Sequence, residues 1–208
     1  MISFEEVKRY LPQYLSSKAQ EKLFEELKQF PSNIDQRIYS AQLAKYDKIL
    51  QGDGINNLLY INLPDTNIAK VPGMVLSNTC DIDQSNVRLM PSRMVYAPIF
   101  NLAKYERALI RDHVETGKKT EQAIASHILD IKRQYISNIF YLPKGGKLEN
   151  DSIVFLDRLN NCPSDLITDD ELPKRRIFAL SDYGFYLFLF KLSVHFTRIR
   201  ESISRSTH

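Results

Sequence analysis

The densest group of reactive side chains lies where an apolar run ends. Residues 72–76 are apolar or small, and five residues that carry hydroxyl, amide, thiol or carboxyl groups follow them: Ser77, Asn78, Thr79, Cys80 and Asp81. A cysteine thiol becomes a nucleophile when a base lies beside it. Asp81 and Asp83 form a D-x-D pair, which has the chemistry of general acid–base groups or of magnesium ligands. One functional interpretation is therefore an active site at the end of a strand.

The same residues also suit a purely structural role. Asn, Thr and Asp side chains hydrogen-bond their own backbone in turns, and cysteine is among the most buried residue types. The histidines that would be bases for Cys80 lie outside any motif, at positions 113, 127, 195 and 208. The chain has no C-x-x-C, no H-x-x-x-H, no G-x-x-x-x-G-K-[ST] and no G-x-G-x-x-G. We expect no cofactor and no metal, and both interpretations of the stretch stay open.

Cations and aromatic rings in the predicted strands and loops offer a second kind of site. Single-stranded nucleic acid binds β-surfaces that combine positive charge with ring faces. The candidates here are Lys70, Arg88, Arg93, Lys144 and Lys147, with Tyr60 and Tyr96. The net charge of +3 is small for a nucleic-acid-binding protein, and tyrosines in strands are commonly half-buried packing residues. Gly145-Gly146, between two of the lysines, suits a hairpin turn or a contact with phosphate.

Apolar periodicity predicts one composite α+β domain over residues 1–208. Its expected parts are a helical N-terminal segment (1–50, with its third helix over 35–48), strands within 51–100 and 136–181, a helical insertion (101–135) and a C-terminal helix (182–208). The predicted strands cover 58–63, 73–77, 93–100, 138–143, 152–159 and 175–181. Because strands lie on both sides of the helical block, we interpret that block as an insertion into the sheet.

The C-terminal helix is predicted to begin at Ser181-Asp182, a good cap. Its apolar residues fall on two faces. One face is a heptad-like seam of Phe185, Leu189, Leu192, Phe196, Ile199 and Ile203, and the other carries Tyr183, Leu187, Phe190 and Val194. A helix that is apolar on two faces is normally buried. Packing in the core is the first interpretation, and a dimer or partner interface is the second.

The composition is ordinary for a folded soluble protein, and we expect the protein to lie in the cytoplasm. No stretch approaches eighteen uninterrupted apolar residues, so we expect no membrane span. The N-terminal residues MISFEEVKRYL carry two glutamates where a signal peptide would carry positive charge. Cys80 and Cys162 are the only two cysteines, which we expect to be free thiols in that compartment.

Three motifs in the front half resemble the MazF/PemK toxin family. They are Q-G-D (51–53), V-P-G-M-V-L-S-N (71–78) and V-Y-A-P-I (95–99), which are similar in order and spacing to the family's R-G-D-type turn, R-P-x-x-V-L-S strand and P-I-T strand. F-Y-L-P (140–143) and S-I-V-F-L-D-R-L (152–159) are similar to its later strands. The resemblance implies a small SH3-like β-barrel, here with N-terminal, inserted and C-terminal helices. The S-N-T-C-D-I form also resembles uncharacterised bacterial proteins from defence or mobile loci.

The chain departs from that family at two positions that matter for its ribonuclease chemistry. Val71, next to Lys70, replaces the arginine before the proline, and Phe100 replaces the hydroxyl residue after P-I. Because a metal-independent cleavage needs a base and a cation, we choose Asp81 as base and Arg88 as cation, with Cys80 as a further catalytic candidate. The substrate-binding candidates are Asp53, Lys70, Ser77, Asn78, Thr79 and Arg93.

The function predicted from these observations is to bind or act on RNA or another nucleic acid, as a toxin or a phage-defence component. If the protein is an enzyme, we expect a metal-independent endoribonuclease-like activity. The alternative is a non-catalytic module that docks a larger effector or forms a homodimer through its C-terminal helix. A concave pocket at residues 77–83 favours the first hypothesis, whereas a flat surface there favours the second.

Overall fold

The structure is a computed structural model of the 208-residue chain. It describes residues 17–197 except 33, 35, 87 and 118–119. The parts of the predicted terminal helices that fall within 1–16 and 198–208 lie outside the described residues.

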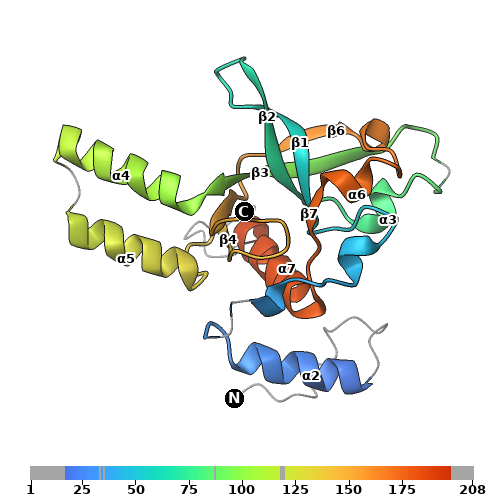
Figure 1. The fold of residues 1–208 in the computed structure, drawn as a ribbon, viewed down its shortest axis with the longest axis horizontal. Coiled ribbons are helices and arrows are strands. Elements are labelled where there is room, and N and C mark those ends of the chain that lie inside the picture. The colour runs from blue at the N-terminus through green and yellow to red at the C-terminus, as the bar shows by residue number, and fades with distance from the viewer. Residues whose placement is uncertain (1–16, 33, 35, 87, 118–119, 198–208) are drawn as a thin grey trace, which may run out of the picture.

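Within the described residues, seven strands form one antiparallel sheet (Figure 1). They are β1 (Gly54–Ile61), β2 (Ile68–Val75), β3 (Arg93–Asn101), β4 (Ile139–Leu142), β5 (Ser152–Phe155), β6 (Asn160–Pro163) and β7 (Arg176–Phe178). Their order is β4-β5-β3-β2-β1-β7, and β6 pairs with β3. The predicted α+β class is confirmed. In the described part of the chain the sheet is not closed, so the predicted barrel is not confirmed.

Strand β3 holds the sheet together because it changes partners along its length. Its first residues pair with β6, its middle with β2 and its last residues with β5. Pro98 lies opposite Gly73 on β2, one residue before Ile99 begins the pairing with β5. Proline has no backbone N–H to donate to a ladder, so a change of partner is a position that tolerates it. The sequence prediction misses β6, whose residues N-N-C-P have little strand propensity.

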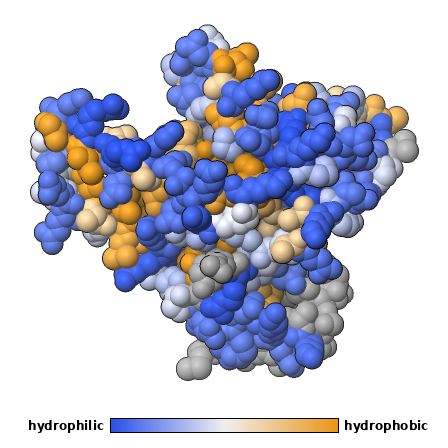
Figure 2. All heavy atoms as spheres, in the orientation of Figure 1, coloured by the Kyte–Doolittle hydropathy of each residue, from blue (hydrophilic) through white to orange (hydrophobic). Residues whose placement is uncertain are grey.

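The predicted helices of the insertion are confirmed. They are α4 (Leu102–Thr116) and α5 (Glu121–Lys132), which lie side by side and reach away from the sheet (Figure 1). Asn101 caps α4 by accepting the backbone N–H of Lys104, and Gly117 ends it in the left-handed conformation with φ of 65°. Thr120 caps α5, as predicted, by accepting the N–H of Ala123. Figure 2 shows apolar side chains along the seam of this two-helix arm.

The final helix α7 (Asp182–Thr197) packs into the largest core cluster. Ser181 Oγ accepts the backbone N–H of Gly184 at 3.1 Å, so the predicted cap is confirmed. Tyr183, Leu187 and Phe188 are buried beneath the sheet strands, which confirms core packing for this half of the helix. In the described part of the chain, no helix is long and apolar enough to cross a membrane.

The helix predicted over 35–48 is wrong. Among its described residues, that segment holds two short 3-10 helices, η1 (Gln36–Ile38) and η2 (Leu43–Lys45), and no α-helix. The backbone of this segment forms hydrogen bonds with residues 179–181. Ser40 N–H donates to Ala179 O, and Ile38 O accepts the N–H of Ser181, each at 2.9 Å. Tertiary pairing therefore replaces the local hydrogen bonds that an α-helix needs. The remaining short elements are α2 (Ser17–Lys28), α3 (Thr79–Ile82), η3 (Ser164–Leu166) and α6 (Leu172–Arg175).

Candidate nucleic-acid interface

The polar stretch after β2 folds into a capped helical turn. α3 begins directly after Asn78, whose side-chain oxygen accepts the backbone N–H of Cys80 at 2.9 Å. Ser77 Oγ accepts the backbone N–H of Val95 at 2.8 Å, and Thr79 Oγ1 accepts that of Gln51 at 2.9 Å. Each of the three side chains thus satisfies a backbone donor where the sheet ladder ends. The Asn78 bond is the local kind that the structural interpretation predicts, whereas Ser77 and Thr79 bond backbone groups that are 18 and 28 positions away.

Asp81 and Arg88, the candidate base and cation, lie together at the surface. Arg88 Nη2 is 3.6 Å from Asp81 Oδ1 and also donates to the carbonyl oxygen of Cys80. The Asp81 side chain is 71% exposed and that of Arg88 38%. The Cys80 residue is exposed as well. The structure therefore brings the three catalytic candidates together at an open surface.

Asp83 has a different partner. Lys48 Nζ donates to Asp83 Oδ2 at 2.8 Å, and Ser85 donates to the other carboxylate oxygen through both its N–H and its hydroxyl. The hydrogen bonds from Lys48 and Ser85 lower the pKa of Asp83 to about 2. The D-x-D pair is thus divided between two cations, Arg88 and Lys48. In the described part of the chain, no three His, Cys, Asp or Glu side chains gather where they could hold a metal ion.

Asp53 lies in the interior. Its Oδ2 accepts hydrogen bonds from Arg176 Nε and from the backbone N–H of Leu50, each at 2.9 Å. Its Oδ1 has no hydrogen-bond partner among the described residues. Burial raises the pKa of Asp53 to about 6, against the opposing effect of Arg176. Arg176 also donates to the carbonyl oxygens of Tyr46 and Lys48. The buried pair therefore fastens the segment that contains η2 to the sheet.

The other two substrate-binding candidates lie on different strands. Lys70 is exposed on β2 opposite Leu59. Arg93 begins β3, and its Nε donates to Asn161 Oδ1 on β6 at 2.6 Å. The structure thus groups the candidates at positions 77–88 and places Asp53, Lys70 and Arg93 apart from one another.

A groove lined by cations, which we call the basic groove, consists of two adjoining pockets. The pockets share Lys147, Arg176 and Ile177 in their linings. The larger has a volume of about 980 Å³ and the smaller about 360 Å³. Three segments that lie far apart in the sequence form the larger one: residues 39–45, the loop between β4 and β5, and residues 173–179.

Positive charge dominates this groove. Lys45 and Lys144 line the larger pocket, Lys174 and Arg175 the smaller, and Lys147 both. Arg175 is already engaged, because it pairs with Glu171 at 3.4 Å and donates to the carbonyl oxygens of residues 56 and 57. Of the described residues that line either pocket, only Glu149 is acidic. Arg176 is buried and neutralised by Asp53, so it supplies rigidity to the floor more than attraction.

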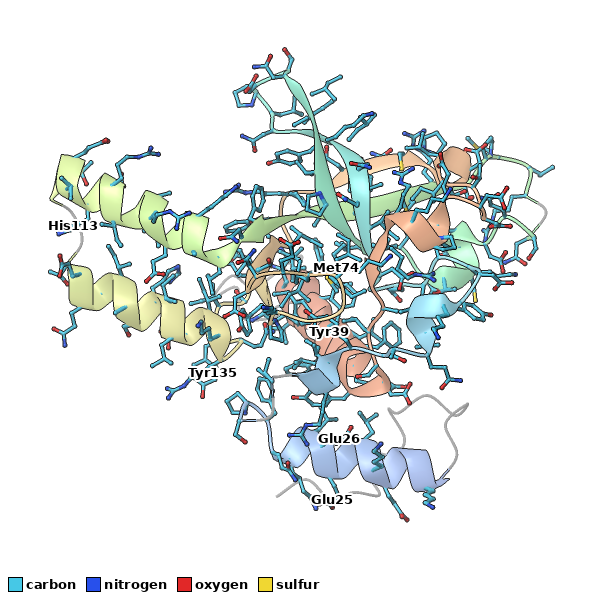
Figure 3. All side chains as sticks on the ribbon, viewed as in Figure 1. Glu25, Glu26, Tyr39, Met74, His113 and Tyr135 are labelled. Atoms are coloured by element: carbon cyan, nitrogen blue, oxygen red, sulfur yellow. The ribbon has the colours of Figure 1, made fainter. Side chains whose placement is uncertain are left out.

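The K-G-G-K loop is held firmly in place beside the pocket. Lys147 N–H donates to Ile177 O and Lys147 Nζ to Pro173 O, each at 2.9 Å. Gly146 adopts φ of 60°, a conformation that favours glycine. A Cβ at Gly145 would come within 2.5 Å of the Tyr39 ring, so only glycine allows the loop to approach that ring. Figure 3 shows Tyr39 in the middle of the molecule, beside this loop.

Sequence reasoning identified only part of the groove. Lys144 and Lys147 are among the nucleic-acid candidates, whereas Lys45, Lys174 and Arg175 are not. The available signal was the basic run P-K-R-R at 173–176, which follows an acidic stretch. Nothing in the sequence pairs this run with the K-G-G-K loop, because the contact between Lys147 and Pro173 spans 26 positions.

Comparison with known proteins adds no relative. No protein-family model matches the chain, and no curated protein matches it significantly. Function is therefore inferred from the geometry and chemistry of these two regions.

Proposed function

We propose that this protein binds single-stranded nucleic acid, with RNA as the first ligand to test, along the basic groove. The observation that carries the proposal is the convergence of four lysines from three separate segments on two adjoining pockets, whose linings contain a single acidic side chain. Phosphate contacts from lysine and arginine supply most of the affinity of sequence-independent binding. The small net charge of +3 is compatible with binding, because the charge is concentrated in one place.

The shape of the groove favours a single strand. Single-strand binders combine a positive channel that follows the backbone with apolar or aromatic surface for the bases. Here the smaller pocket is polar and cationic, with Asn101, Asn150 and Ser152 beside Lys174. The larger pocket adds the apolar surface of Tyr39, Pro173 and Ile177. A duplex offers its phosphates on a broad convex face and keeps its bases stacked inside, so it gains little from such pockets.

Anisotropy of a fluorescein-labelled single-stranded RNA of about twelve nucleotides tests the proposal. The groove variant is Lys144→Glu/Lys174→Glu. Its matched control is Lys70→Glu/Arg93→Glu, which makes the same change in net charge at two residues outside the groove. We expect the groove variant to lose affinity about tenfold or more, because two phosphate contacts become repulsive. Equal losses in both variants, or no binding by the unaltered protein, would overturn the proposal; competition by polyglutamate but not by RNA would point to an acidic protein partner.

A second candidate function is cleavage of the bound RNA. The observation that favours it is the ion pair of Asp81 and Arg88, which brings an acid and a cation within reach of one ligand. In a metal-independent cleavage Asp81 would take the 2′-hydroxyl proton and Arg88 would stabilise the developing charge on phosphate. Gel analysis of RNA incubated with and without magnesium, beside Asp81→Ala and Arg88→Ala, tests this role. Loss of cleavage in both variants would support the catalytic role of this pair. If the unaltered protein leaves the RNA intact, the cleavage function is excluded.

We also propose that the open sheet is a divergent form of the MazF/PemK barrel. The motifs V-P-G-M-V-L-S-N and V-Y-A-P-I lie on adjacent antiparallel strands, with Gly73 opposite Pro98 and Val75 opposite Tyr96. An experimentally determined structure tests the proposal. Hydrogen bonds that join the two ends of the strand order would support it, and solvent between β4 and β7 would contradict it.

A further inference from the structure

The larger pocket of the basic groove has the size and lining of a small-molecule site. Its volume of about 980 Å³ lies within the range of 300–1,000 Å³ that is typical of ligand pockets. The walls are mainly apolar and come from Tyr39, Ala41, Ala44, Pro173, Ile177 and Phe178. A purely electrostatic track for phosphates would not need so much apolar wall.

The apolar wall is fixed before any ligand arrives. Tyr39 Oη donates to Pro143 O at 2.6 Å, and its ring lies 5.0 Å from that of Phe178. Phe178 itself is 1% exposed. On the other side, Gly145 approaches the Tyr39 ring more closely than any residue with a Cβ could. A preformed wall costs little ordering free energy when a ligand binds.

The cationic side chains of the larger pocket are different residues from those that form its apolar wall. Lys45, Lys144 and Lys147 are exposed, and none of the described residues lining this pocket is acidic. Arg176 on the floor is occupied by Asp53 and by backbone carbonyl groups. A ligand that fits therefore has a flat apolar body for the wall and an anionic group for the lysines.

We propose that the larger pocket binds one unstacked nucleotide, with its base against the wall of Tyr39, Ile177 and Pro173 and its phosphate beside the lysines. The inference rests on the proposed function and adds to it the place where a base is held. The adjoining smaller pocket, with Lys174 and Lys147, then carries the neighbouring phosphates. Duplex nucleic acid is excluded from this arrangement unless one nucleotide leaves the stack.

Two oligonucleotides and one nucleotide test the inference. The first oligonucleotide is the labelled single-stranded RNA, and the second has the same length and phosphates but abasic sugars throughout. The free nucleotide is AMP, used as a competitor. The blocking variant is Ala41→Trp, which fills the pocket from an exposed lining position and leaves every lysine in place. Ala103→Trp, at an exposed position on α4, is its matched control.

We expect the unaltered protein to bind the base-bearing strand about tenfold or more tightly than the abasic strand, because base contacts add to phosphate contacts. Ala41→Trp is expected to abolish this difference without weakening the abasic strand, and Ala103→Trp is expected to keep it. Competition by AMP that Ala41→Trp removes would identify the free nucleotide as a ligand. If AMP does not compete but the protein still prefers the base-bearing strand, the ligand of the pocket is a nucleotide within a nucleic-acid strand and not the free nucleotide.

The failures are distinguishable. If both strands bind the unaltered protein equally, or if Ala41→Trp retains the preference for bases, the pocket does not hold a base although the groove still binds phosphates. If AMP binds and neither strand does, the pocket assignment stands and the proposed function falls. If no ligand binds, both fall. The comparison of the two strands on the unaltered protein does not depend on the folding of any variant.

Discussion

The end of β2 and the basic groove are both rich in charge, but they use it in different ways. At the end of β2 each acid has a nearby cation: Asp81 lies beside Arg88, and Asp83 is bound by Lys48. In the groove, Arg175 pairs with Glu171, but Lys45, Lys144 and Lys174 make no ion pair within the described part of the chain. Charges that pair with each other have little attraction left for a ligand, whereas charges that share one sign over two pockets attract anions.

The two regions also differ in what they contribute to stability. Asp81 and Arg88 at the end of β2 are exposed, and we expect their removal to cost the fold little. The groove has its structural support underneath, in the buried pair of Asp53 and Arg176. A residue that looked like a substrate ligand in the sequence is therefore part of the floor that shapes the groove. Variants in the two regions test this division, beginning with the largest expected effect.

Breaking the buried pair should cost the most stability. Arg176→Met leaves the Asp53 carboxylate buried without its partner and frees the segment around Tyr46 and Lys48. We expect a loss of about 3–5 kcal/mol in the free energy of unfolding, measured by urea denaturation. Arg88→Met serves as the control and should change stability by less than about 1 kcal/mol. Equal losses in the two variants would show that the two regions do not differ in this way.

Removing groove lysines should change the salt dependence of RNA binding. For single strands, the slope of log affinity against log salt falls by about 0.7 for each phosphate that the protein no longer neutralises. We expect Lys144→Met and Lys174→Met each to reduce the slope by that amount. Arg88→Met should leave the slope unchanged. A larger change in the Arg88 variant would move the binding surface to the end of β2.

The pKa values of Asp53 and Asp83 should be shifted in opposite directions from the usual value of 3.8. Burial raises the pKa of Asp53 to about 6, so its ionisation costs stability, and this cost is relieved as pH falls from about 6 towards 4. The pKa of Asp83 is lowered to about 2, so its bonds to Lys48 and Ser85 add stability above about pH 4 that is lost as pH falls through 2. Carboxyl carbon chemical shifts in NMR titrations measure both values, and Asp53→Asn and Asp83→Asn assign the signals. Two ordinary titration curves would refute the distinction.

The smallest effect is expected at Asp81. Because its side chain is exposed and its ion pair is loose, Asp81→Ala should alter the free energy of unfolding by less than about 0.5 kcal/mol. Thermal or urea unfolding measures this change. A loss above about 1 kcal/mol would mean that the end of β2 is held together by this pair and is not an independent surface.

Much of the secondary structure was predictable because it follows local rules. Thr120, Ser181 and the glycine pair of the β4–β5 loop carry their signals in one or two residues, and each has the predicted place. The third N-terminal helix is absent because the backbone of this segment forms hydrogen bonds with residues 179–181 in place of helical ones. Strand β6 exists only through its pairing with β3, so neither feature was predictable from local sequence. The polar run at 77–81 follows strand β2, as predicted, but the helical turn α3 that Asn78 caps was not predicted.

The sequence by itself determined the α+β class, the two-helix arm, the caps at Thr120 and Ser181 and the core packing of the first half of α7, because periodicity and capping depend on neighbours within a few residues. The second half of α7 leaves Phe190 and Phe196 exposed, which the two predicted apolar faces did not indicate. Only the tertiary structure decided which charges are paired and which are free. It buried Asp53 against Arg176, 123 positions away, and brought the K-G-G-K loop to the P-K-R-R segment. The reason is that the free energy of a charge depends on its burial and its partners, and both are set by contacts between distant parts of the chain.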